Sequence, residues 1–223
     1  MITCVGVGPG DPGYLTYHAQ RLIAGADLVC GFDSVLNFIA SNITSKAEIV
    51  ALTYSNQVDK LKEVAQSHHA GKQCVVAFMG DIHFSGFQLL ERVERACGHA
   101  VDTIPGISSA QVLAARGRVC FDETTFVTFH RRGDLEPFMS HLVQSLKAGR
   151  NAIVIPRPWD FMPNKIAAYL IDQGIDGATT VEVWESLTGR EATWIGELSS
   201  CTAEFSDMSI MLIRSAQPME SQI

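Results

Sequence analysis

Short apolar runs alternate with longer stretches of helical periodicity along this chain, and this alternation is the strongest constraint on its fold. Residues 73–80 (QCVVAFMG) form a continuous apolar run, which is typical of a strand in a parallel sheet covered on both faces. Residues 56–72 and 87–98 carry the apolar spacing of amphipathic helices. The pattern predicts an α/β fold.

The expected elements follow one another in the same style over the whole chain. Expected strands are 2–7, 28–31, 47–52, 73–80, a short one between 99 and 104, 124–130, 151–156, 179–186 and 207–214. Expected helices are 15–27, 56–72, 87–98, one ending at 117, 135–150 and 162–174. Thr16 is an expected helix N-cap, while Gly71 and Gly98 are expected helix ends. The strands at 179–186 and 207–214 could pair as antiparallel neighbours.

Glycine and charge interrupt the apolar periodicity at residues 116–124, which predicts a boundary between two lobes. We expect an N-terminal α/β lobe at 1–117, with a mostly parallel sheet, and a smaller mixed α/β lobe at 118–214. Residues 215–223 are polar and are expected to be a disordered tail.

Composition excludes several classes of protein. The net charge of −7 argues against nucleic acid as a partner. No apolar run approaches the roughly 20 residues of a membrane span, and no secretory signal is evident. The six cysteines are scattered without a C-x-x-C pair, so reduced thiols in a cytoplasmic protein are expected rather than a zinc site. His68, His69, His83 and His99 lack metal-ligand spacing, and we assign no metal.

The first loop looks like a phosphate-binding loop but lacks its chemistry. Gly8, Gly10 and Gly13 satisfy G-x-G-x-x-G, yet Pro9 and Pro12 each remove a backbone donor and Asp11 would repel phosphate. The loop therefore suits a neutral or cationic ligand, or it is a tight turn with no ligand.

Six segments taken in order resemble the tetrapyrrole (precorrin) methylase family, the class III S-adenosylmethionine-dependent methyltransferases. They are VGVGPGDPGYLT (5–16), ADLVCG (26–31), VVAFMGDIHFSG (75–86), IPGISSAQVLAARG (104–117), FVTFHRRGD (126–134) and VEVWESLTGREATWIGEL (181–198). The resemblance covers residues 1–214. It implies S-adenosylmethionine bound in a cleft between the two lobes, and a homodimer.

Details within these segments are most similar to the precorrin-6Y methylase branch. This branch methylates C5 of precorrin-7 or cobalt-precorrin-7 in cobalamin biosynthesis, and a partner chain carrying decarboxylation and C15 methylation is implied. Ile82 stands where the family has proline after Gly-Asp, and His130-Arg131-Arg132-Gly133 stands where the branch has His-Gly-Arg. The alternatives are another methylase branch, such as a uroporphyrinogen-III or another precorrin methyltransferase, and a non-catalytic tetrapyrrole-binding module.

The resemblance also implies site residues. The matching cofactor contacts are Pro9, Gly80, Asp81, Phe84, Ser108, Ser109, Ile155, Pro156 and Leu187. Ser108 and Ser109 also fit a helix N-cap role.

A corrinoid substrate bears many carboxylates, which gives His130, Arg131 and Arg132 a role in binding it, since arginine pairs with carboxylates bidentately. A solvated loop is the alternative. Asp33 matches an acid/base aspartate of a related branch, or it caps a helix. Trp159, Phe161 and Trp184 could face a macrocycle or pack in the core. No catalytic residue is identified.

Overall fold

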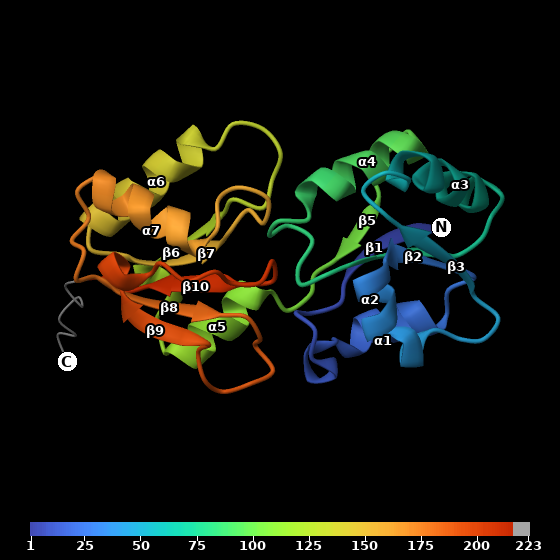
Figure 1. The fold of residues 1–223 in the computed structure, drawn as a ribbon. Helices are drawn as coiled ribbons and strands as arrows, with labels where there is room; N and C mark the ends of the chain where they lie inside the picture. Colours follow the sequence, from blue (N-terminus) through green and yellow to red (C-terminus); the bar gives the residue numbers. More distant parts are fainter. Residues whose placement is uncertain (216–223) are drawn as a thin grey trace. The chain divides into compact units, whose positions relative to one another are not determined.

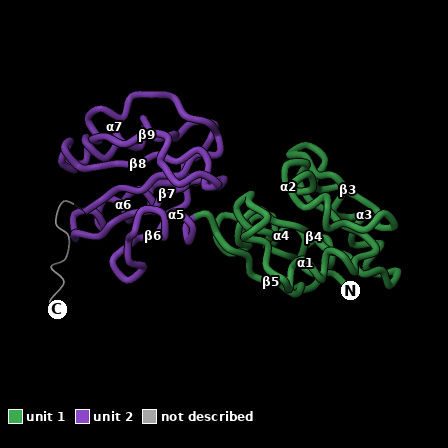
Figure 2. Tube along the Cα trace, turned by 90° about the horizontal axis from the view of Figure 1, so that it is seen from below, with its two compact units in different colours: residues 1–109 green, residues 110–223 purple. Residues whose placement is uncertain are grey.

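The computed structural model describes residues 1–215 and divides into two compact units, Met1–Ser109 and Ala110–Ile223 (Figures 1 and 2). Apart from Ser215, the predicted tail lies outside the described residues.

Unit 1 is built on a five-stranded parallel sheet. Its strands are β1 (Ile2–Gly6), β2 (Leu28–Phe32), β3 (Glu48–Leu52), β4 (Cys74–Phe78) and β5 (Asp102–Ile104), in the order β3-β2-β4-β1-β5. Because the strands are parallel, their carboxyl ends share one edge of the sheet, and loops that follow different strands meet there. The predicted parallel sheet is confirmed.

Helices cover both faces of this sheet (Figure 1). They are α1 (Tyr17–Ala24), α2 (Asp33–Phe38), α3 (Gln57–His69) and α4 (Phe87–Cys97). Side chains alternate along each strand, so Cys4 joins the buried cluster with Leu61 and Val93 of α3 and α4, whereas Val5 joins the one with Ile23 of α1.

The predicted helix ends of unit 1 are confirmed. The Thr16 hydroxyl accepts a hydrogen bond from the Ala19 amide at 3.1 Å and so caps α1. Gly71 and Gly98 follow α3 and α4 with φ angles of +94° and +76°, the left-handed conformation that glycine favours.

Unit 2 contains a five-stranded mixed sheet. Its elements are α5 (Ser109–Gly117), β6 (Thr124–Thr128), α6 (Glu136–Lys147), β7 (Asn151–Ile155), α7 (Pro163–Asp172), β8 (Thr180–Trp184), β9 (Trp194–Glu197) and β10 (Ile210–Ile213). The strand order is β6-β7-β10-β8-β9, with β6 and β7 parallel and the other neighbours antiparallel. The expected antiparallel pair, β8 and β10, is confirmed.

The boundary between the units lies between Ser109 and Ala110, after the first residue of α5 and earlier than the predicted boundary at 116–124. The cause is contact of α5 with β10. Arg214 of unit 2 donates to the Gly117 carbonyl at 2.8 Å, and a Cβ on Gly117 would meet Leu212 Cδ2 at 2.3 Å. With α5 assigned to unit 2, the two units are nearly equal in length, and the second is not the smaller one.

None of the helices within residues 1–215 combines the length and apolarity needed to cross a membrane. All six cysteines are free thiols, and Cys120 alone among them is exposed. Burial raises the pKa of the Cys30 thiol to about 12, so this thiol stays protonated and unreactive at neutral pH.

Candidate functional site

The loops after β1 and β4 are hydrogen-bonded to each other at the carboxyl edge of the unit 1 sheet. The Gly80 amide donates to the Gly8 carbonyl at 2.8 Å, and the Gly8 amide donates to the Gly80 carbonyl at 3.2 Å. The two glycine turns that the sequence places 72 positions apart are therefore neighbours, which the pattern of either turn alone does not reveal.

Three glycines allow the backbones of these loops and of the loop after β5 to touch. A Cβ on Gly106 would lie 2.2 Å from the Gly80 carbonyl oxygen, and a Cβ on Gly6 would lie 2.5 Å from the Gly106 nitrogen. Because the clashing atoms belong to the backbone, no side-chain movement could relieve them. The loops after β1, β4 and β5 form one compact surface.

Asp81 joins two of these loops through its carboxylate. Oδ1 accepts a hydrogen bond from the His83 amide at 2.9 Å, and Oδ2 accepts one from the Gly106 amide at 3.0 Å. The family resemblance implied that Asp81 contacts the cofactor. The structure gives it a second task, because charge-assisted bonds hold the loop after β5 against the loop after β4.

Gly80 packs against the start of α5. A Cβ on Gly80 would lie in van der Waals contact with Ser108 Cα and the Ser109 nitrogen, each at 3.9 Å. Gly10, with a φ of +104°, faces open space: no heavy atom of the described residues comes within 4 Å of an added Cβ. The structure therefore brings four predicted cofactor residues, Gly80, Asp81, Ser108 and Ser109, to one place.

The proline-rich first loop is shaped by its own aspartate. Asp11 Oδ1 accepts a hydrogen bond from the Gly13 amide at 2.8 Å and caps the short 3-10 helix η1 (Pro12–Tyr14). Pro9 is half-buried. The Asp11 carboxylate thus stabilises the turn itself.

The segment after Asp81 departs from the family pattern at Ile82, and the structure gives the reason this is tolerated. The Ile82 side chain is completely buried in the apolar cluster that includes Phe78 and Leu90. Phe84, a predicted cofactor residue, is half-buried two positions on, where its amide donates to the Asp81 carbonyl at 3.4 Å.

Asp33 is not the helix cap that we considered. Phe32 occupies the N-cap position of α2, and Asp33 is the first helical residue, with an exposed side chain. A carboxylate in the first turn still favours the positive end of the helix. Asp33 follows β2, so it also lies at the carboxyl edge of the sheet.

In unit 2, two loops meet at the carboxyl ends of the parallel strands β6 and β7. The first contains His130, Arg131 and Arg132, and the second runs from 156 to 162. Arg157 Nη1 donates to the Gly133 carbonyl at 3.4 Å, and the His130 ring lies 5.9 Å from the Trp159 ring. The predicted substrate residues therefore share one edge of unit 2.

The side chains of this basic loop differ in environment. Burial lowers the pKa of the His130 imidazole, although the carboxylate of Asp207 opposes this shift, so His130 is neutral at pH 7. The Arg131 guanidinium lies 4.1 Å above the Phe138 ring, and its buried Nε has no hydrogen-bond partner within residues 1–215. The Arg132 side chain is exposed.

The remaining unit 2 predictions concern buried positions. Pro156 and Leu187 are buried, and the Ile155 carbonyl accepts a hydrogen bond from the Phe129 amide at 2.8 Å. Trp184 is only 3% exposed and donates to the Glu182 carboxylate at 3.1 Å. Trp184 is therefore a core residue rather than a macrocycle contact.

His68 and His99 are neighbours in the structure although they are 31 positions apart in the sequence. His68 Nε2 lies 3.0 Å from His99 Nε2, because α3 and α4 end side by side. Spacing along the chain could not reveal this pair. No group of three His, Cys, Asp or Glu side chains in the described part of the chain is arranged to hold a metal ion.

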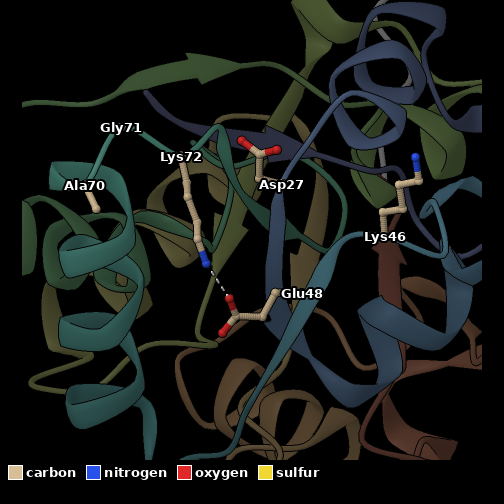
Figure 3. A pocket seen from close by; sticks show the side chains of 6 residues that line it. All are labelled: Asp27, Lys46, Glu48, Ala70, Gly71 and Lys72. Carbon is tan, nitrogen blue, oxygen red and sulfur yellow. Dashed lines mark hydrogen bonds and ion pairs between the residues drawn. The ribbon is translucent and has the colours of Figure 1, made fainter.

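A groove of about 530 Å³ opens elsewhere on unit 1 (Figure 3). Asp27, Lys46, Glu48, Ala70, Gly71 and Lys72 line it. These residues precede or begin β2, β3 and β4, so the groove lies at the amino edge of the sheet. Its Lys72 ammonium is paired with Glu48 at 2.8 Å. The groove is thus remote from the glycine loops, and we do not assign methyl transfer to it.

The fold and the loops define a class of protein. Ligands of α/β sheets bind at the carboxyl ends of parallel strands, and three glycine loops of this chain meet there. The model of the tetrapyrrole (corrin/porphyrin) methylases matches residues 1–201. The chain belongs to this family and is a methyltransferase, as the family resemblance predicted.

Individual relatives agree with this assignment. The chain is 32% identical over 192 residues, 84% of its length and 84% of the relative, to a probable cobalt-precorrin-7 C(5)-methyltransferase of Methanocaldococcus jannaschii. It is 26% identical over 221 residues to a siroheme synthase of Gluconobacter oxydans, covering 92% of this chain but only 46% of that protein.

Solved structures share the fold. The methyltransferase CobJ aligns with a TM-score of 0.79 at 18% identity, over 96% of this chain and 94% of that one. The precorrin-6Y methylase of Archaeoglobus fulgidus aligns with a TM-score of 0.70 at 24% identity, over 97% and 99% of the two chains. The predicted methyltransferase fold is confirmed.

Proposed function

We propose that this methyltransferase transfers the methyl group of S-adenosylmethionine to C5 of precorrin-7 or cobalt-precorrin-7 in cobalamin biosynthesis. The observation that carries the position on the ring is the 32% identity, over 84% of the chain, to a probable cobalt-precorrin-7 C(5)-methyltransferase. The sequence details of the loop after β6 and of the segment after β8 support the same branch.

The glycine loops of unit 1 fit a bound S-adenosylmethionine. Gly80 lies against Ser108 and against Ser109, the first residue of α5. A helix start favours negative charge, which suits the carboxylate of the methionine part. Pro9 and Pro12 remove phosphate-binding donors without affecting a ligand that has no phosphate. Binding between the lobes stays a prediction.

S-adenosylmethionine supplies an already activated methyl group. An electron pair of the ring carbon forms the new bond to the methyl carbon. The bond between the methyl carbon and the sulfonium sulfur breaks, and sulfur keeps the electrons of that bond as neutral S-adenosylhomocysteine. The macrocycle, which takes up the positive charge, then loses a proton to solvent. The protein therefore acts mainly by approach and orientation. We assign the unit 1 loops to the cofactor and assign no general base.

The substrate side of the proposal rests on unit 2. Arg131 and Arg132 can pair with the peripheral carboxylates of a corrinoid. Arg131 is held over Phe138 at 4.1 Å, so part of the cost of ordering its side chain is already met before substrate binds. His130, neutral and half-buried, can donate or accept one hydrogen bond there.

The test is a methylation assay on purified protein with S-adenosylmethionine and a panel of substrates, read by mass spectrometry. We expect precorrin-7, cobalt-precorrin-7 or both to gain one methyl group at C5, and uroporphyrinogen III to stay unchanged. Methylation of uroporphyrinogen III or of another precorrin instead would move the chain to another branch. Tetrapyrrole binding without methyl transfer would support a non-catalytic module.

The same assay tests the partner proposal. We propose that a separate chain supplies decarboxylation and C15 methylation, as the precorrin-6Y branch implies, and that both act in the cytoplasm. The product of this chain alone should then carry the C5 methyl group and keep the carboxylate that decarboxylation would remove. A product that has also lost that carboxylate would contradict the need for a partner.

A further inference from the structure

Trp159 presents an exposed indole on unit 2. Trp159 is 56% exposed. The other two tryptophans of the chain are used differently: Trp184 is buried, and Trp194 packs against Phe205 with ring centroids 6.2 Å apart. A single exposed aromatic residue is common on protein surfaces, so a ligand is indicated only by how Trp159 is held and by the groups around it.

The turn that carries Trp159 is closed by backbone hydrogen bonds. The Arg157 amide donates to the Phe161 carbonyl at 3.0 Å, and the Phe161 amide donates to the Arg157 carbonyl at 2.9 Å. Arg157 Nε also pairs with Asp160 Oδ1 at 2.5 Å. These contacts hold Trp159 at the tip of a tight turn rather than on a loose loop.

The base of the turn is fastened to the core. The Phe161 ring packs edge-on against the buried Phe129 ring at 5.0 Å and lies 6.1 Å from Tyr169. Phe161 is therefore a core-packing residue, as one of the two interpretations expected. The turn that carries Trp159 is therefore ordered before any ligand binds, which lowers the entropy cost of binding.

The surroundings of the indole indicate the chemistry of the ligand. The Arg157 guanidinium lies 5.7 Å from the Trp159 ring and the His130 ring lies 5.9 Å from it. Arg157 is paired with Asp160, so its charge stabilises the turn. Arg131 and Arg132 follow His130 directly in the sequence and provide further positive charge. A flat apolar surface beside basic groups suits a planar ring system with acidic edges.

We propose that Trp159 and His130 form a shelf on which the macrocycle of the substrate rests, while the arginines bind its carboxylates. This inference rests on the proposed function, because it names a specificity-determining contact for that reaction. Trp159 is a positioning residue: it touches the ring system but takes no part in forming or breaking a bond.

The test compares variants in the methylation assay with the substrate found from the panel. Trp159→Ala should raise KM about tenfold, the size expected for one lost stacking contact, and change kcat less than twofold. Trp159→Phe should restore most of the affinity. Ile195→Ala, at a residue 64% exposed on β9 of the same unit, should leave KM unchanged. Affinity for S-adenosylhomocysteine should stay within twofold in every variant.

Fluorescence gives a second readout that a merely structural role would not move. Substrate should quench the tryptophan emission of the parent protein, and Trp159→Phe should lose most of this quenching while it keeps a near-parental KM. A KM for Trp159→Ala within twofold of the parent would overturn the shelf and leave the proposed function intact. A parent that methylates no tetrapyrrole would overturn both.

Discussion

At the scale of single residues, Gly106 is a position where the loops that we propose to bind the cofactor tolerate little change. Gly106→Ala would place a methyl group 2.2 Å from the Gly80 carbonyl oxygen. The methyl group is attached directly to the backbone and the oxygen belongs to the backbone, so no side-chain rotation can relieve the clash. We expect the free energy of unfolding to fall by about 1–3 kcal/mol and S-adenosylhomocysteine binding to be lost. Urea denaturation and calorimetry measure the two effects.

Gly189 provides the matched control for this substitution. An added Cβ there has no heavy atom of the described residues within 4 Å, so Gly189→Ala should leave both quantities nearly unchanged. If Gly106→Ala binds S-adenosylhomocysteine as the parent does, the three glycine loops are not the cofactor site.

The basic loop of unit 2 makes a separate residue-scale prediction about substrate class. Changing Arg131 and Arg132 to alanine should raise KM for a corrinoid by tenfold to several hundredfold, since each carboxylate pair is worth roughly 1.5–3 kcal/mol. Cofactor affinity should hardly change. Arg190→Ala, at an exposed residue of the same unit, is the control. An unaffected KM in the double variant would mean that these arginines are ordinary solvated charges and do not bind the substrate.

At the scale of elements, the ion pair of Glu182 and Arg214 holds α5 on the unit 2 sheet. Arg214 Nε donates to Glu182 Oε1 at 2.8 Å, and Arg214 Nη2 donates to the Gly117 carbonyl at the end of α5 at 2.8 Å. The Glu182 side chain is 8% exposed and that of Arg214 is 36% exposed. Removing the arginine leaves a buried carboxylate whose only remaining described partner is the Trp184 indole.

We therefore expect Arg214→Met to lower the free energy of unfolding by about 1–3 kcal/mol, less than for a fully buried pair because Arg214 is partly hydrated. Hydrogen exchange should speed up in α5 first. The double variant Glu182→Gln with Arg214→Met should recover part of the loss, since it removes the uncompensated charge. A single variant as stable as the parent would mean that α5 is held by packing alone.

Some helices and strands could be predicted from the sequence and others could not. Long periodic helices and apolar strands were predicted because burial imposes their pattern. The α2 helix was expected only as an alternative interpretation of Asp33, without bounds, because it has six residues. The β9 strand was missed because every second residue of this edge strand is exposed. The boundary was misplaced because the hydrogen bond that assigns α5 to unit 2 joins residues 97 positions apart.

The same limit applies within the candidate site. The resemblance named Asp81 and Ser108, but the hydrogen bond from Gly106 to the Asp81 carboxylate and the contact of Gly80 with Ser108 appear only in the fold. Trp159 and Trp184 look alike in sequence, and burial alone separates an exposed ring from a core residue. The kinds of chemical group at the candidate site could be predicted from residue types, whereas the contacts between those groups could be identified only in the structure.

At the scale of the whole molecule, an exposed margin of unit 1 bears on assembly. β3 is an edge strand, and Ile49 on it is 58% exposed. Tyr54, between β3 and α3, is 68% exposed, and Val58, in the first turn of α3, is 58% exposed. Natural proteins usually protect such edges with charge or cover them. We propose that this margin is where a second copy of the chain binds.

The expected assembly is a homodimer that buries at least about 1,000 Å² in total. Sedimentation at micromolar concentration should give a dimer for the parent and a monomer for the variant Ile49→Lys with Val58→Lys, because two ammonium groups would have to lose their water at the contact. Both side chains are mostly exposed, so the variant should fold. Ile195→Lys, at an equally exposed residue of the edge strand β9, should remain dimeric. A monomeric parent would refute the homodimer, whereas a dimer broken by Ile195→Lys alone would place the interface on unit 2.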